Sequence, residues 1–161
     1  MPETRRQRAS TLRFIAVRMG LPDLTQAVRK PGISEGFRVT VLYHDGRHPN
    51  QIATLLWAHD DAVSLEVIYR GGRNNPILRY AIAPDRYRMF DRALRQTGFD
   101  RLDDQPDLPL GGVDLWLVER ASGSFIHDVV LSPDLVVEPY AGIVHVVRAH
   151  LREAVRAIQP E

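Results

Sequence analysis

The chain has 161 residues, 44% of them hydrophobic and 25% charged, and its 21 basic and 20 acidic residues leave a net charge of +1. This length and composition suit one globular domain and argue against a largely disordered chain. The absence of cysteine excludes disulfides, thiolate nucleophiles and cysteine-ligated metal centres, and the balanced charge argues against a strong overall attraction to nucleic acid.

The N-terminal segment is charged and lacks the apolar core of a signal peptide. No apolar run approaches the roughly 18 residues needed to span a membrane. We therefore expect a cytoplasmic protein without a membrane partner.

The first ten residues are polar and rich in arginine, which predicts a flexible tail over residues 1–10 ahead of a single domain over 11–161. Alternating apolar residues over 11–18 predict a strand, with a helix as the competing interpretation. The segment that follows Pro22-Asp23 predicts one or two helical turns, ended by a proline–glycine pair.

The middle of the chain contains four short segments in which apolar and other residues alternate as they do in strands. Turn residues rich in glycine, aspartate and asparagine separate them, which predicts an antiparallel meander. The predicted strands are residues 37–43, 51–59, 62–70 and 77–83.

Two segments have the apolar spacing of amphipathic helices, residues 85–97 and 143–158. Between them, residues 113–120 and 124–131 predict a hairpin whose arms are apolar on both faces, which is typical of covered strands. The fold class that follows is α+β, a mostly antiparallel sheet of about six or seven strands with the two helices packed on one face.

The hairpin carries the residues best suited to acid–base chemistry, because a histidine and carboxylates in apolar strands can have shifted pKa values. The candidates are His127, Asp128, Glu119 and Asp114. A turn at 121–124 predicts that Asp128 lies opposite Leu117 and His127 opposite Val118.

Adjacent strand residues point to opposite faces, so His127 and Asp128 cannot form one dyad without a bulge. A catalytic histidine would need a carboxylate from another position. The competing interpretation is that His127 is a structural histidine of the sheet and that Asp128 pairs with an arginine.

Candidate binding residues are Trp116 on the hairpin and Arg86 and Arg92 on the 85–97 helix. Clustered arginines can contact phosphate groups or nucleic acid. These arginines spread over more than one helix face and have acidic neighbours, which favours a solvated surface, and we do not expect a nucleic-acid partner.

Two loops also hold polar clusters. His44, Asp45 and His48 gather near one turn, and the Gly-Gly-Arg-Asn-Asn run at 71–75 could cradle an anion with its backbone N–H groups. Neither has the spacing of an established metal or phosphate motif. We interpret both as ordinary turns and expect no metal and no cofactor.

Residues 90–133 show a helix ending in glycine and phenylalanine, a polar loop and a hairpin with a distinctive order of residues. This order resembles a pattern in small bacterial α+β proteins of uncharacterised function, in which the acid occupies a slightly different place. The resemblance implies a fold and no activity. Its residues are Gly112, Asp114, Trp116, Glu119, Gly123, Phe125, His127, Ser132 and Pro133.

The sequence therefore favours a non-catalytic binding or protein-interaction module, which could form a homodimer through an edge strand or a sheet face. One alternative is a small acid–base enzyme that uses His127 with a nearby carboxylate. A further alternative is a nucleic-acid binder that uses the arginine-rich surface.

Overall fold

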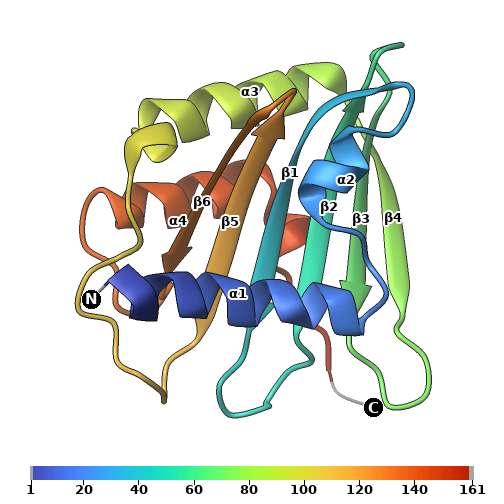
Figure 1. Cartoon of the computed structure of the whole chain (residues 1–161). Helices are drawn as coiled ribbons and strands as arrows, with labels where there is room; N and C mark the ends of the chain where they lie inside the picture. Colours follow the sequence, from blue (N-terminus) through green and yellow to red (C-terminus); the bar gives the residue numbers. More distant parts are fainter. Residues whose placement is uncertain (1, 160–161) are drawn as a thin grey trace.

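The computed structural model describes residues 2–159, with side chains from Gln7 onward. Its centre is a six-stranded sheet in which every neighbouring pair is antiparallel (Figure 1). The strand order is β4-β3-β2-β1-β5-β6, which confirms the predicted α+β class with six strands. The strands are β1 (Ile33–Leu42), β2 (Gln51–Ala58), β3 (Val63–Tyr69), β4 (Ile77–Ile82), β5 (Leu115–Ser122) and β6 (Phe125–Leu131).

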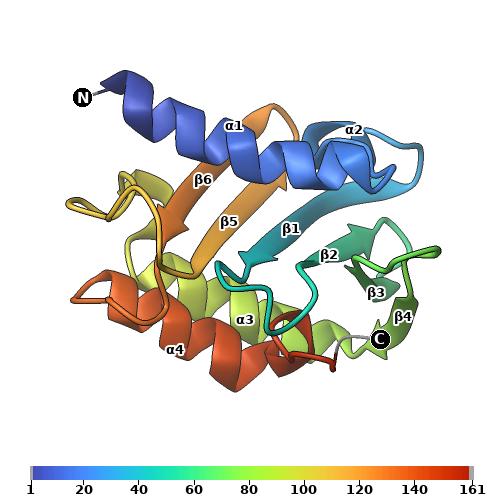
Figure 2. The same ribbon diagram turned by 90° about the horizontal axis from the view of Figure 1, so that it is seen from below.

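Helices cover both faces of this sheet, which makes three layers (Figure 2). Helices α1 and α2 lie on one side, and α3 and α4 lie on the other. The helical elements are α1 (Pro2–Arg18), α2 (Leu24–Val28), α3 (Pro84–Gln96), η1 (Phe99–Arg101), α4 (Tyr140–His150) and η2 (Arg152–Ala154). Among the described residues, no helix has both the length and the apolar character needed to cross a bilayer.

The larger core lies between the sheet and helices α3 and α4, on the face where both were predicted to pack. Alternate residues of each strand point into it, because side chains along a strand alternate between faces. Phe37 of β1 contacts Phe90 of α3 edge to face, with ring centroids 4.9 Å apart. Val147 of α4 belongs to the same cluster and is fully buried.

The predicted strand at residues 11–18 is wrong, because this segment belongs to helix α1. Ala9, Leu12 and Ala16 of this helix are buried, as is Met19 directly after it, and their spacing of three to four residues is that of a helix face. Phe14, which the strand interpretation placed beside Leu12, is 57% exposed.

The arginine-rich tail predicted for residues 1–10 is likewise the first part of α1 over residues 2–10, and residue 1 lies outside the described residues. Because α1 and α2 cover the second face, the prediction of helices on one face described only half of the packing.

The last helix is shorter than predicted. Helix α4 begins at Tyr140 and ends at His150, whereas the apolar spacing predicted a helix over 143–158. Leu151 leaves the helical conformation, with φ −140° and ψ 48°. The chain then turns so that Leu151 and Ala154 are buried against the sheet, where the Gln51 side chain donates to the Ala154 carbonyl at 2.9 Å.

The β5–β6 hairpin is shifted by two residues from the predicted register. Glu119 lies opposite Asp128, and Arg120 lies opposite His127. The connection has only two residues between Ser122 and Phe125, and Gly123 takes a φ of +60° there. Such a tight turn needs positive φ at its first position, which glycine adopts without strain.

Candidate functional site

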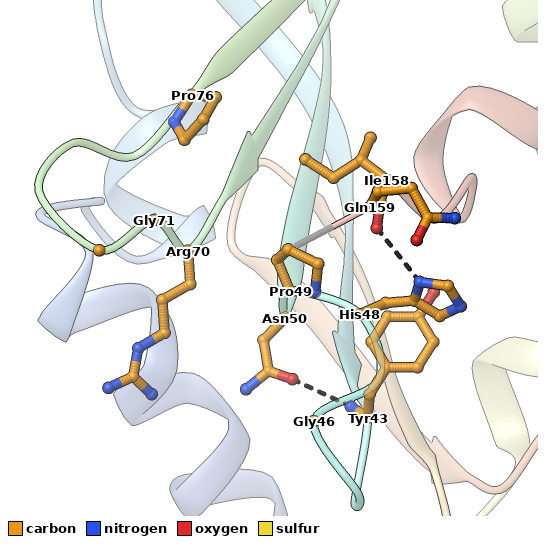
Figure 3. Close-up of a pocket in the computed structure, with 11 residues that line it drawn as sticks. Tyr43, Gly46, His48, Pro49, Asn50, Arg70, Gly71, Pro76, Ile158 and Gln159 are labelled. Atoms are coloured by element: carbon orange, nitrogen blue, oxygen red, sulfur yellow. Dashed lines mark hydrogen bonds between the residues drawn. The ribbon is translucent and has the colours of Figure 1, made fainter. Parts of the chain in front are cut away.

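Two loops and the C-terminal segment meet at one end of the sheet. Antiparallel pairing brings the end of β1 and the start of β2 beside the end of β3 and the start of β4. Loops 43–50 and 70–76 therefore lie next to each other, and residues 158–159 close the space between them. They enclose a pocket of about 600 Å³, which we call the loop-end pocket (Figure 3). Its lining residues are Tyr43, Gly46, His48, Pro49, Asn50, Arg70, Gly71, Gly72, Pro76, Ile158 and Gln159.

Local hydrogen bonds fix the two loops. The Asn50 side chain accepts a hydrogen bond from the Tyr43 backbone N–H at 3.0 Å, and the Asn75 side chain accepts one from the Gly71 N–H at 3.0 Å. A Cβ atom at Gly71 would lie 1.7 Å from the Asn74 carbonyl oxygen, so this loop shape requires glycine at that position. The glycine and asparagine residues are therefore needed for the loop shape itself.

The pocket has apolar walls and a few polar groups. Tyr43, Pro49, Pro76 and Ile158 supply the apolar surface. The half-buried His48 is held on one side, where its Nδ1 lies 3.2 Å from the Ile158 carbonyl oxygen. Its ring also meets the Tyr43 ring edge to face, at 5.1 Å between centroids. This arrangement holds the imidazole in one orientation.

Arg70 lies across the pocket from His48, beyond Pro49 and Asn50 (Figure 3). Its guanidinium is exposed and has no ion-pair or hydrogen-bond partner among residues 7–159. Among residues 7–159, those that line the pocket include no carboxylate side chain. The fixed charge of the lining is therefore positive.

A buried carboxylate network borders the same end of the sheet. Asp114, just before β5, accepts hydrogen bonds from the His44 backbone N–H at 3.1 Å and from the His44 ring Nδ1 at 2.7 Å, and it forms an ion pair with Arg47. Burial alone would raise the pKa of Asp114, but the bonds from Arg47 and His44 outweigh burial and hold that pKa below its usual value.

The network and the pocket share a wall. The Arg47 guanidinium lies over the Tyr43 ring, 5.1 Å from its centroid. Burial, together with the nearby charge of Asp114, raises the pKa of Tyr43. The phenol therefore stays protonated and can donate a hydrogen bond at neutral pH.

The same network contains the residues best placed for a metal ion. His44, Asp45 and Asp114 each offer a ligand atom, and these atoms lie within 4.8 Å of one another. Arg47, however, donates to Asp45 at 2.9 Å and also pairs with Asp114. The guanidinium already supplies the positive charge that a metal ion would bring, so the arrangement is a complete ion-pair network.

The hairpin candidates do not come together as an acid–base pair. Glu119 and Asp128 lie beneath α1, where Arg13 binds both carboxylates. His127 lies on the opposite face of the sheet, with Nε2 2.8 Å from the Leu102 carbonyl oxygen. Asp114 precedes the start of β5, whereas His127 pairs with Arg120 near the end of that strand. The geometry matches the competing interpretation, in which Asp128 pairs with an arginine.

The three predicted binding residues also lie away from the loop-end pocket. Trp116 is 3% exposed, in the main core, with Arg148 over its ring. Arg86 donates to the His150 carbonyl at 3.0 Å and pairs with Glu153, so it ties α3 to the end of α4. Arg92 is exposed and lines a shallow groove on α3.

The sequence pointed to the histidines of loop 43–50 and to the glycine turn at 71–75 as separate turns. Their meeting depends on the pairing of β2 with β3. The link between His44 and Asp114 depends on the pairing of Leu42 with Leu115. Residues so far apart in the chain give no local signal of these contacts.

Comparisons with protein families and with curated proteins found no match. The chain matches no protein-family model, and no curated protein matches it with significance.

Proposed function

We propose that the protein is a non-catalytic binding module and that its loop-end pocket takes a small anionic ligand with an apolar or ring-shaped part. The observation that carries this proposal is the lining itself, which, in the described part of the chain, combines apolar walls with the unpaired Arg70 and no carboxylate. Small-molecule sites commonly have this character, mostly apolar with a few placed polar groups, in volumes of roughly 300–1,000 Å³.

Charge argues for an anion rather than a cation. A guanidinium donates two parallel hydrogen bonds to a carboxylate or phosphate, and these charge-assisted bonds are among the stronger polar contacts. Arg70 has such a fork free for a ligand, whereas Arg47 is already bound to Asp45 and Asp114. Tyr43 and His48 on the other side offer ring faces and edges for the apolar part.

Binding is better supported than catalysis. The carboxylate closest to a histidine, Asp114, already accepts bonds from His44 and Arg47, so its charge is balanced before any substrate arrives. His127 makes no hydrogen bond or ion pair with the side chains of Glu119, Asp128 or Asp114, all of them described residues. Two arginines of the surface considered for nucleic acid are engaged internally, since Arg8 donates to the Leu108 carbonyl and Arg86 to that of His150.

The test uses phenyl phosphate as the anionic probe and benzylamine as a cation with the same ring, both followed by amide chemical shifts in NMR titrations. We expect phenyl phosphate to shift resonances from loops 43–50 and 70–76, and benzylamine to leave them in place. The substitution Arg70→Gln should weaken phenyl phosphate binding about tenfold or more, because it removes a charge-assisted contact of roughly 1.5–3 kcal/mol.

Arg73→Gln is the matched control, because Arg73 belongs to the same loop and does not line the pocket. It should leave binding within about twofold of the unmodified protein. Equal responses to both probes, or equal loss in both variants, would contradict the proposal.

A further inference from the structure

The two edges of the sheet differ in how they are covered. At β6, the outward-facing Val130 N–H donates to the Asp104 side chain at 2.8 Å, and the Val130 carbonyl accepts from the Gln105 N–H at 2.9 Å. The Gln105 side chain also accepts from the Ser132 N–H at 3.0 Å. The chain's own loop therefore occupies the second half of this edge.

The other edge, β4, is open. The Tyr69 N–H donates to the Pro76 carbonyl at 2.9 Å, and antiparallel pairing alternates inward and outward residues. It follows that Ile77, Arg79 and Ala81 direct their backbone N–H and carbonyl groups away from β3. No residue in the described part of the chain bonds to these outward groups. Figures 1 and 2 show β4 as the outermost strand, past the end of α1.

The side chains on this edge are mainly apolar. Ile77 is 41% exposed and Leu78 44% exposed, and Tyr80 is half-buried. The single charged residue of the strand, Arg79, pairs with Glu66 of β3 at 3.0 Å. Natural proteins usually protect an edge with charges, proline, bulges or a covering loop. Residues 77–82 contain no proline and no bulge, and no loop in the described part of the chain covers them.

We infer that β4 is an interaction surface and that its partner is β4 of a second copy of this chain, paired antiparallel about a two-fold axis at Arg79. This register uses all three outward residues, because Ile77 then faces Ala81 of the second copy and Arg79 faces its own counterpart. Between them, Leu78 lies opposite Tyr80, an apolar and aromatic pair of the kind that stabilises sheets. Each Arg79 keeps Glu66 as its counter-charge.

The contrast between the edges is the argument for a second copy. In a two-fold pairing every apolar contact is made twice, once from each copy. The pairing also joins the two sheets into a single sheet of twelve strands, six from each copy. Both β4 edges are used in this pairing, and the outer ends of the joined sheet are both β6, whose second half the loop at residues 104–105 covers, so the pairing closes as a dimer. The inference does not depend on what the loop-end pocket binds.

Disulfide trapping tests the register directly, because the chain has no cysteine of its own. Directly opposed residues of a hydrogen-bonded pair have Cα atoms about 5.5 Å apart, which suits a disulfide. Under mild oxidation, Arg79→Cys should form a covalent dimer in most of the protein. Ile77→Cys should not form a covalent dimer, because residue 77 faces Ala81 of the second copy. Ile126→Cys on β6 should not form one either. Equal trapping by all three variants would overturn the inference.

Light scattering tests the surface without a crosslink. Ile77 and Ile126 are matched, since they are 41% and 42% exposed on the two edge strands. Ile77→Lys should weaken the dimer at least about tenfold, because it sets a charge against the paired edge, while Ile126→Lys should leave it intact. A strict monomer for the unmodified chain at about 100 µM would overturn the inference, as would equal effects of the two variants.

Discussion

Asp114 and Glu119 are two carboxylates on one stretch of chain, each 4% exposed and each paired with an arginine. Their pKa values nevertheless move in opposite directions. The pKa of Asp114 lies below its usual value, whereas burial raises the pKa of Glu119 despite the contact with Arg13. Equal side-chain exposure therefore does not give equal electrostatics, since Glu119 is surrounded by more of the protein than Asp114, which lies near one end of the sheet.

The deeper burial of Glu119 and the larger number of donors to Asp114 together explain the difference. Asp114 accepts from the backbone and ring of His44 and from Arg47. Glu119 accepts one bond, from the Arg13 Nε at 3.1 Å, and shares that guanidinium with Asp128. Arg38 lies opposite Glu119 in the sheet but donates to Thr54 and to the Pro22 carbonyl instead. Hydrogen bonds to the ionised form decide whether burial is overcome.

The largest effect should come from Arg13→Leu, which removes the counter-charge of Glu119 and Asp128 together. Breaking a buried pair costs roughly 3–5 kcal/mol, and the partial exposure of Arg13 reduces this to about 2–3 kcal/mol at pH 7. The cost should shrink on acidification to pH 4, because the folded pKa of Glu119 is raised and its carboxylate is protonated before that pH is reached. Urea unfolding followed by circular dichroism at both pH values measures it.

Arg18→Leu on the same helix is the control, because Arg18 is exposed and its guanidinium lies over the Phe14 ring. We expect a loss below about 0.5 kcal/mol. If the two variants lost equal stability, Arg13 would have no special role beneath α1.

A smaller effect is expected from Asp114→Asn, at about 1–2 kcal/mol in the free energy of unfolding at pH 7. The folded pKa of Asp114 is depressed, so its stabilisation is present above the ordinary value of about 3.9 and is lost as the pH falls through the folded value. The gap between variant and unmodified protein should therefore close on acidification. Asp134→Asn, at an exposed loop position, should show no such gap.

The smallest effect should come from Glu119→Gln, which should change the free energy of unfolding by no more than about 1 kcal/mol at pH 7. The loss of the charged contact with Arg13 destabilises the variant, whereas removal of a buried charge stabilises it. The folded pKa of Glu119 is raised, so the stability contributed by its protonated form is present below about pH 4.3 and is lost as the pH rises through the folded value. The variant should gain on the unmodified protein as the pH rises from 4 to 7. If the difference in unfolding free energy from the unmodified protein changed with pH in the same direction for Asp114→Asn and Glu119→Gln, the comparison would be refuted.

Local patterns predicted those elements in which the spacing of apolar residues fits either a strand or a helix, but not both. The alternation in β1 to β4 and the helical spacing of α3 are unambiguous, and the structure confirms both. In α1, Leu12 and Ala16 fit a strand face as well as a helix face, and the exposure of Phe14 shows which one is correct. The hairpin register depended on which residues form the turn, and Gly123 decides it.

The loop-end pocket and the Asp114 network could not be predicted in the same way. His44 and Asp114 are seventy residues apart and meet because β1 pairs with β5. Neighbouring strands in the chain are the usual first choice for pairing, and the β1–β5 contact instead joins strands separated by a meander and helix α3. The chemistry at this end of the sheet follows from strand order, which single-residue patterns do not encode.

The position of Ile158 and Gln159 in the pocket wall has a practical consequence for handling the protein. Any affinity tag or fluorescent reporter fused after residue 161 would start within a few residues of the loop-end pocket. The start of α1, by contrast, lies beside β6, at the other edge of the sheet from the loop that joins β3 to β4 (Figure 1). Fusions intended for ligand measurements therefore belong at the N-terminal end, and a C-terminal fusion would itself report on how open the pocket is.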